Sequence, residues 1–289
     1  MTTPTTPPTP SAPQQQPAPA PQAAPAGFYT SPIPVRPATL GDAIASEWTK
    51  IRSVRSTMWT LGVMIVLLLG IGLLAAVAVD SAGSDLGSTP VLSLGFFGVL
   101  LGSICVITLG VMTIASEYGT GMIRTTLTAC PSRARVLSAK AIVFFLLTFV
   151  ITTLMTALVG LLQTALIDSA APSGDDWLRA TVGVGLYTAA LGLLSLAVGA
   201  LIRHSAGAIT IMIGVVLLPL VLAMFMFTDS LNDLRMALFE YSIPNQLSAF
   251  YSTSVADSGP SGWDPLWIML GVAAVALFGA YAALDRRDV

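Results

Sequence analysis

The chain has 289 residues, of which 10% are charged and 54% are hydrophobic. A soluble domain usually carries about 25% charged residues, so this chain has too little charge to cover a soluble globule of its size. Two cysteines are too few for a disulfide scaffold, and the dominance of apolar residues excludes collagen and a wholly disordered chain. The composition therefore indicates a membrane protein that crosses the bilayer several times.

The first 37 residues differ in composition from the rest of the chain. They hold 12 of the 19 prolines, and no charged residue occurs before Arg36. The segment also lacks the basic start and the apolar core of a signal peptide. We expect residues 1–37 to form a disordered cytoplasmic tail, because such a composition buries too little apolar surface to fold, and residues 38–289 to form one membrane domain.

Six charge-free apolar tracts follow, and each is long enough to cross a hydrocarbon core of about 30 Å as a helix. None alternates polar and apolar residues in the manner of a barrel strand. The predicted fold class is an all-α membrane protein with six transmembrane helices, preceded by an amphipathic interfacial helix. The expected spans cover residues 57–79, 91–115, 141–167, 181–202, 207–227 and 265–284.

Basic residues gather on one side of these spans and acidic residues on the other. Of the 13 Lys and Arg residues, four precede the first span, four lie between the second and third, one follows the fourth and two lie at the C-terminus. The positive-inside rule therefore places both termini and these loops in the cytoplasm. The predicted location is the cytoplasmic membrane, with several passes through the bilayer.

An amphipathic helix is predicted at residues 40–55. Apolar residues recur there at spacings of three or four, as at Leu40, Ile44 and Trp48, and charged residues occupy the other face. Thr39 and Asp42 fit a capping box at its start. We expect this helix to lie at the membrane interface, and packing against the ends of the spans is compatible with that position. The residues expected to set its place are Glu47, Trp48, Lys50 and Arg52.

The segment from Glu117 to Lys140 is the most informative loop. Two early glycines permit a sharp change of direction, residues 122–127 fit a short helix, and Ser132 is a candidate N-cap for a helix that runs into the third span. A docking element for another protein and an ordinary basic connector both fit this pattern.

Four short segments resemble the type-2 ABC transporter permeases, and the last two look like actinobacterial members. They occur in family order around the six spans, as SEWTKIRS at residues 46–53, EYGTGMIRTTL at 117–127, PSR at 131–133 with AK at 139–140, and LDRRDV at 284–289. The resemblance implies the membrane-spanning subunit of an ABC exporter, which pairs with a second permease copy (the same or a different chain). It implies that a separate ABC ATP-binding subunit holds ATP and Mg and hydrolyses the ATP, so that this chain is not an enzyme. It makes residues 40–55 the elbow helix and assigns the ATPase-coupling contact to Glu117, Tyr118, Gly119, Gly121, Met122, Arg124 and Arg133.

The residue types agree with an external energy source. The span interiors hold no Asp, Glu or His, which a proton- or ion-coupled carrier normally needs. Neither of the two lysines follows a phosphate-cradling glycine loop, so the chain has no ATPase site of its own. If the protein pumps a substrate, which could be drug-like, a peptide or lipid-like, the energy has to arrive through a partner.

Other chemistry is weakly indicated. His204 marks a loop boundary, Cys105 is a small apolar residue within a span, and Cys130 lies in a reducing compartment, so no catalytic site, metal site, cofactor or nucleic-acid partner is predicted. The alternative to a permease is a membrane-embedded enzyme, or a membrane anchor or regulatory protein without an ATPase partner.

Two further patterns concern packing. Small residues recur along the fourth span from Gly185 to Gly199, which permits close helix contact either at a subunit interface or inside the bundle, and we expect contact inside the bundle. The loop at residues 229–264 holds enough apolar residues to predict short helices near the outer membrane surface, broken at Pro244 and at Gly259-Pro260.

Overall fold

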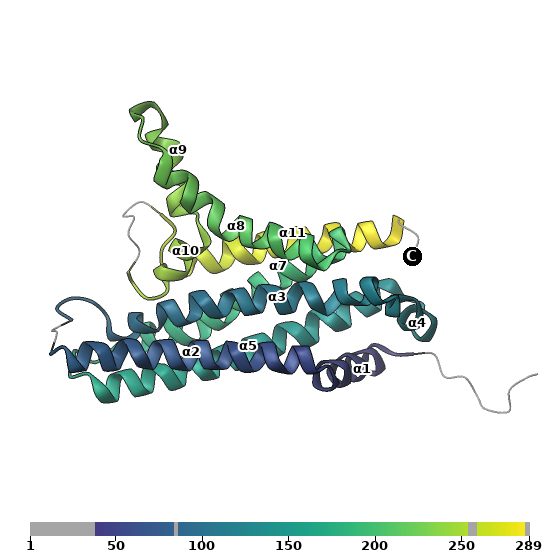
Figure 1. Ribbon diagram of the computed structural model, residues 1–289, viewed down its shortest axis with the longest axis horizontal. Helices are drawn as coiled ribbons and strands as arrows, with labels where there is room; N and C mark the ends of the chain where they lie inside the picture. Colours follow the sequence, from purple (N-terminus) through teal and green to yellow (C-terminus); the bar gives the residue numbers. More distant parts are fainter. Residues whose placement is uncertain (1–37, 84–85, 254–258, 287–289) are drawn as a thin grey trace, which may run out of the picture. The chain divides into compact units, whose positions relative to one another are not determined.

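The computed structural model describes residues 38–83, 86–253 and 259–286, and the expectation for residues 1–37 falls outside them. Within these residues there is no strand, and six helices are long and apolar enough to cross a membrane (Figure 1). The prediction of an all-α fold with six spans is therefore confirmed.

The spans are joined by short helices and turns. Helix α1 (Leu40–Ser53) comes first, and α4 (Met122–Ala129) links the second and third spans. The spans are α2 (Arg55–Ser81), η1 with α3 (Val91–Gly95 and Phe96–Thr120), α5 (Arg133–Leu166), α6 with a π-helical turn and α7 (Gly174–Leu178, Arg179–Gly183 and Val184–Ile202), α8 (Ser205–Phe225) and α11 (Asp264–Arg286).

Helix ends differ from the predicted bounds where a cap or a backbone break decides them. Helix α1 ends at Ser53 rather than at residue 55, because Val54 is extended and α2 starts directly after it. Helix α5 starts at Arg133, as the predicted N-cap Ser132 indicates, because the Ser132 side chain accepts a hydrogen bond from the Arg135 backbone. The span predicted from residue 141 is the later part of this helix. The predicted Thr39–Asp42 capping box is present at the start of α1.

Helix α7 forms the centre of the bundle and packs against α3, α5 and α11. Its glycines make this contact possible: a Cβ on Gly185 would meet Thr153 Oγ1, and one on Gly192 would lie 2.5 Å from Phe144 Cε1. On the facing helix, a Cβ on Gly110 would lie 2.6 Å from the Gly192 carbonyl oxygen. The small-residue stripe therefore packs inside the bundle, as its spacing favours.

The segment after α8 contains the predicted short helices, but one of them is not at the surface. Helix α9 (Asn232–Glu240) is exposed or half-buried at every residue except Glu240, whereas every residue of α10 (Ile243–Ala249) except Pro244 is buried. Pro244 does not break a helix; it lies in the first turn of α10, where its missing N–H costs no hydrogen bond. Ile243, Leu247, Phe250 and Tyr251 thus form part of the core, whereas Leu234 and Tyr241 are exposed.

The two ends of the bundle carry different elements (Figure 1). Helices α1 and α4 lie at the end where α3 finishes and α5 begins, and the last turn of α11 joins them through a hydrogen bond from Arg133 Nη1 to the Leu284 carbonyl. We call this the α1 end. Helices α9 and α10 belong to the opposite end, the α10 end.

Candidate functional site

Four charged side chains from three helices meet at the α1 end. Helix α1 supplies Glu47 and Lys50, the last turn of α3 supplies Glu117, and α5 supplies Lys140. Both lysines of the chain are in this set. We call these four residues the charge ring.

Each member of the charge ring contacts two members of opposite charge. Lys140 Nζ lies 2.8 Å from Glu47 Oε2 and 2.6 Å from Glu117 Oε1. Lys50 Nζ lies 2.7 Å from Glu47 Oε1 and 2.8 Å from the same Glu117 oxygen. The charges alternate around the ring, so it is neutral as a whole.

The ring is largely out of contact with solvent. The side chain of Lys140 is 1% exposed and those of Glu47 and Glu117 are 6% exposed, whereas that of Lys50 is 27% exposed. Burial makes an unpaired charge costly, and removing one partner of a buried pair typically destabilises a protein by about 3–5 kcal/mol. The ring therefore fixes α1 against α3 and α5.

Hydrogen bonds extend the ring to the backbone and to α4. Lys140 also donates to the Thr113 carbonyl oxygen (3.2 Å), and Lys50 also donates to Thr126 Oγ1 on α4 (3.3 Å). Burial alone would lower the pKa of Lys50, but hydrogen bonds and opposite charges from Glu117 and Glu47 outweigh it and raise that pKa above its ordinary value. Lys50 is therefore charged at any physiological pH.

One acceptor of the ring is unused. Glu117 Oε2 is buried and has no hydrogen-bond partner among the described residues, although Glu117 Oε1 accepts from both lysines. A buried carboxylate oxygen without a partner is uncommon, because desolvation then goes uncompensated. The carboxylate thus has capacity for a further donor.

Helix α4 presents a partly apolar outer face. Its backbone leaves α3 through Gly121, whose φ of 73° lies in the left-handed region that favours glycine. Ile123 is buried against the bundle, whereas Met122, Arg124 and Thr125 are exposed. The short helix predicted at residues 122–127 is present, and Met122 lies on its exposed side.

The residues predicted from sequence as the ATPase-coupling contact fall into two groups. Gly119, Gly121, Met122 and Arg124 are exposed on or beside α4. Glu117 is buried in the charge ring, and Tyr118 and Arg133 are partly buried. Arg133 bonds to the Leu284 carbonyl, and the Tyr118 ring lies 4.9 Å below the Arg203 guanidinium.

The residues predicted to set the position of α1 also divide in two. Trp48 and Arg52 are exposed, as an interface with lipid headgroups requires. Glu47 and Lys50 instead face the bundle in the charge ring. Sequence reasoning treated Lys140 as a loop-side basic residue and missed its place in the ring. Lys50 stands three residues after Glu47, but the acidic residue nearest to Lys140 along the chain is Glu117, 23 residues away, so no local pattern marks Lys140 as a member of the ring.

Two cavities border the charge ring. One, of about 330 Å³, lies between α1 and α4 and is lined by Asp42, Ser46 and Thr125 among others. The second, of about 310 Å³, lies between α1, α3 and the start of α2. Glu47, Lys50 and Met122 line both of them. The α1 end is therefore indented on both sides of the ring.

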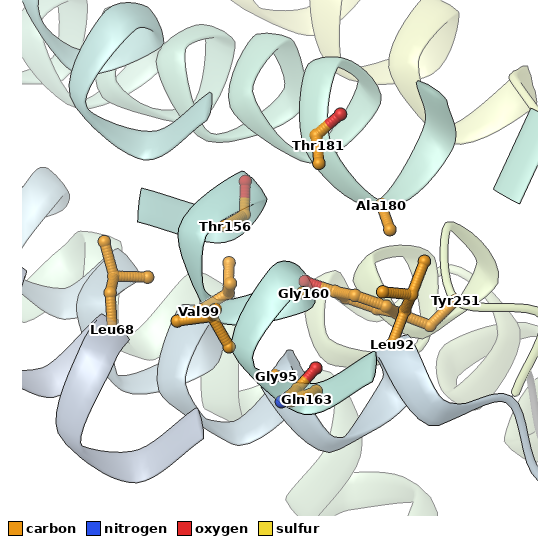
Figure 2. Close-up of a pocket in the computed structure, with 11 residues that line it drawn as sticks. Leu68, Leu92, Gly95, Val99, Thr156, Gly160, Gln163, Ala180, Thr181 and Tyr251 are labelled. Carbon is orange, nitrogen blue, oxygen red and sulfur yellow. The ribbon is translucent and has the colours of Figure 1, made fainter. Parts of the chain in front are cut away.

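The cavity drawn in Figure 2 lies between the spans and is much smaller. Its volume is about 10 Å³, which is room for about one water molecule. Gln163 lines it with an unpartnered Oε1, while its Nε2 donates to the Gly72 carbonyl (3.1 Å). Ala180 and Thr181 of the π-helical turn and Tyr251 line it too. No substrate fits this cavity in the conformation described.

Within the described residues, no three His, Cys, Asp or Glu side chains gather in a way that holds a metal ion. The described fold and the α1 end define a helical membrane protein of six spans, with a short exposed helix between its second and third spans. The family model for the ABC-2 family transporter protein matches residues 43–226, which is more than half of the chain. The chain belongs to this family and is a membrane-spanning component of an ABC transporter.

The matched region runs from α1 to the end of α8, so it includes the charge ring and α4. The resemblance drawn from the four sequence segments is therefore confirmed at the level of the family, whereas the actinobacterial likeness stays a prediction. No curated protein matches the chain.

Proposed function

We propose that this chain is the permease subunit of an ABC exporter in the cytoplasmic membrane, driven by ATP hydrolysis on a separate ATP-binding subunit. The observation that carries the proposal is the family match over residues 43–226. It is supported by the distribution of charge, because 11 of the 13 basic residues fall on the side of the spans that includes the α1 end. On this proposal the α1 end and both termini are cytoplasmic.

The ATP-binding subunit would dock on the exposed face of α4. Met122 offers an adaptable apolar contact, and Arg124 offers a charge that pairs with a carboxylate on the partner. Glu117 is too buried to touch a partner directly, so its part in coupling would be to hold α4 in place. A second permease copy, identical or not, would complete the transporter.

The transported molecule would be apolar or amphipathic, of drug-like, peptide or lipid class. This proposal is supported by the apolar character of the spans, whose described interiors offer no charged side chain for a strongly polar cargo. In the described conformation the cavity between the spans is too small for such a molecule, so transport would require the spans to separate.

Site-specific photo-crosslinking in the native host tests the docking surface. A photoreactive residue at Thr125, exposed on α4, should crosslink to a protein that carries a phosphate-binding Walker motif, identified by mass spectrometry. The same residue at Asn232, exposed on α9 at the α10 end, is the matched control and should not. A Walker-motif protein captured from Asn232 and not from Thr125, or from neither position, would overturn the proposal.

A further inference from the structure

The charge ring joins α1, α3 and α5 beside α4 at the α1 end. Glu47 and Lys50 belong to α1, Glu117 to the last turn of α3, and Lys140 to the start of α5. Helix α4 is covalently continuous with α3 through Gly121 and leads into α5 through Pro131 and Ser132. A displacement of α4 would therefore act through the ring on α1, α3 and α5 together.

We propose that the charge ring, together with Thr126, is the positioning element that sets α4 relative to α1 and the spans. Lys50 is its central member, because the same ammonium group contacts Glu47 on α1, Glu117 on α3 and Thr126 on α4. A movement of α4 is transmitted through Lys50 to the buried pairs of Lys140. The role of the ring in transport rests on the proposed function, but its role in positioning α4 does not.

The contacts of the charge ring differ in strength, and this difference determines which helix is displaced first. The contacts among the four charges are ion pairs of 2.6–2.8 Å between largely buried groups, so α1, α3 and α5 are held tightly. Among the described residues, the ring holds α4 only through one 3.3 Å hydrogen bond from Lys50 to the neutral hydroxyl of Thr126, and the other contacts of α4 with the bundle include its chain connections and the packing of Ile123. Helix α4 is therefore the member that moves first.

The second carboxylate oxygen of Glu117 allows Lys50 to shift without losing its charge pairing. Both lysines share Glu117 Oε1, and Glu117 Oε2 is buried beside it without a partner. If α4 draws Lys50 aside, Lys50 exchanges one oxygen of the carboxylate for the other, and no ammonium is left unpaired. A packed element with two discrete pairings is the kind that transmits a displacement between sites.

Distances between spin labels on the full chain in lipid nanodiscs test the proposal without any ATP-binding subunit. With Cys105 and Cys130 replaced by alanine, one label pair reports on α1 and α4 (Ala45→Cys with Thr128→Cys). A second pair reports on α1 and α5 (Ala45→Cys with Ala134→Cys), and all three labelled positions are exposed. Both pairs should give one narrow distance distribution in the otherwise unchanged chain.

Thr126→Val removes the tether of α4 and leaves the four charges intact. The α1–α4 distribution should lose its single narrow peak, while the α1–α5 distribution stays narrow. Thr125→Val, next to Thr126 on α4, is the matched control for the α1–α4 pair, because the Thr125 hydroxyl donates within α4, to the Met122 carbonyl. An α1–α4 peak that stays narrow in Thr126→Val would overturn the proposal.

Charge inversion separates pairing from packing. Inverting the charges of Glu47 and Lys140 alone (E47K and K140E) places like charges beside Lys50 and Glu117. The α1–α4 and α1–α5 distance distributions should then both broaden. Inverting all four residues (E47K, K50E, E117K and K140E) restores the alternation and should restore a narrow α1–α5 distribution. A four-fold variant that folds and remains as broad as the two-fold variant would overturn the proposal, and if it does not fold, Thr126→Val decides alone.

Discussion

Lys140 Nζ lies 2.8 Å from Glu47 Oε2, although 93 residues separate the two along the chain. The contact joins the helix that precedes the first span to the start of the third span. Because the side chain of Lys140 is 1% exposed, its ammonium group depends on this carboxylate and on that of Glu117 for its charge pairing. The helix before the first span is thus an integral part of the bundle.

Lys140→Met should destabilise the protein strongly. The substitution leaves two carboxylates of the ring with one ammonium group, and the expected loss in the free energy of unfolding is about 3–5 kcal/mol. Unfolding by titration with a denaturing detergent measures it. Arg124→Met, an exposed change of the same kind on α4, is the control and should stay within about 0.5 kcal/mol of the unaltered chain. Equal effects of the two substitutions would show that the ring contributes no stability.

Gly110→Ala should destabilise the contact between α3 and α7. The new Cβ would lie 2.6 Å from the Gly192 carbonyl oxygen, a backbone atom that cannot rotate away, and overpacking of this kind costs about 1–3 kcal/mol. Gly70→Ala on α2 is the same substitution with nothing within 4 Å of the new Cβ. It should leave stability unchanged or raise it by less than about 1 kcal/mol. The same detergent titration compares the two, and the reverse order of stability would contradict the close packing of α3 and α7.

The contribution of Lys50 to the stability of the fold should be lost at alkaline pH. Its pKa is raised in the folded chain, so the folded state holds the proton more tightly than the unfolded state does. This stabilisation is present in full below the unfolded pKa of about 10.4 and is lost as pH rises through the folded pKa. Since Lys50 is partly exposed, this stabilisation should be under about 1 kcal/mol.

Thermal midpoints measured from pH 7 to pH 11 check this expectation. The midpoint of the unaltered chain should approach that of Lys50→Met only above about pH 10.4. A difference that vanishes between pH 7 and 9 would mean that Lys50 has a lowered pKa instead.

Labelling with a membrane-impermeant maleimide tests the predicted orientation. In a chain without native cysteines, Thr125→Cys on α4 should react only after the cells are permeabilised, because the positive-inside rule places the α1 end in the cytoplasm. Asn232→Cys on α9 should react in intact cells. Both positions are exposed, so access to the reagent depends on the side of the membrane alone. The opposite pattern would invert the topology.

Local patterns in the sequence predict most of this fold. Apolar length gives the six spans, the spacing of Leu40, Ile44 and Trp48 gives α1, and Ser132 marks the start of α5. The charge ring is different, since its members pair across separations of up to 93 residues and meet only when three helices pack. The burial of α10 depends equally on tertiary packing, because its amides and hydroxyls suit a wet surface as well as a core.

ATP hydrolysis by the purified full chain, taken with its native partners from host membranes, tests the central claim most directly. The chain has no phosphate-binding loop, so hydrolysis in the preparation has to come from a docked ATP-binding subunit. We expect hydrolysis with the unaltered chain and its loss in Arg124→Glu, at equal amounts of permease and an unchanged thermal midpoint. A preparation that lacks both hydrolysis and an ATP-binding protein, or hydrolysis that is equally strong in Arg124→Glu, would contradict it.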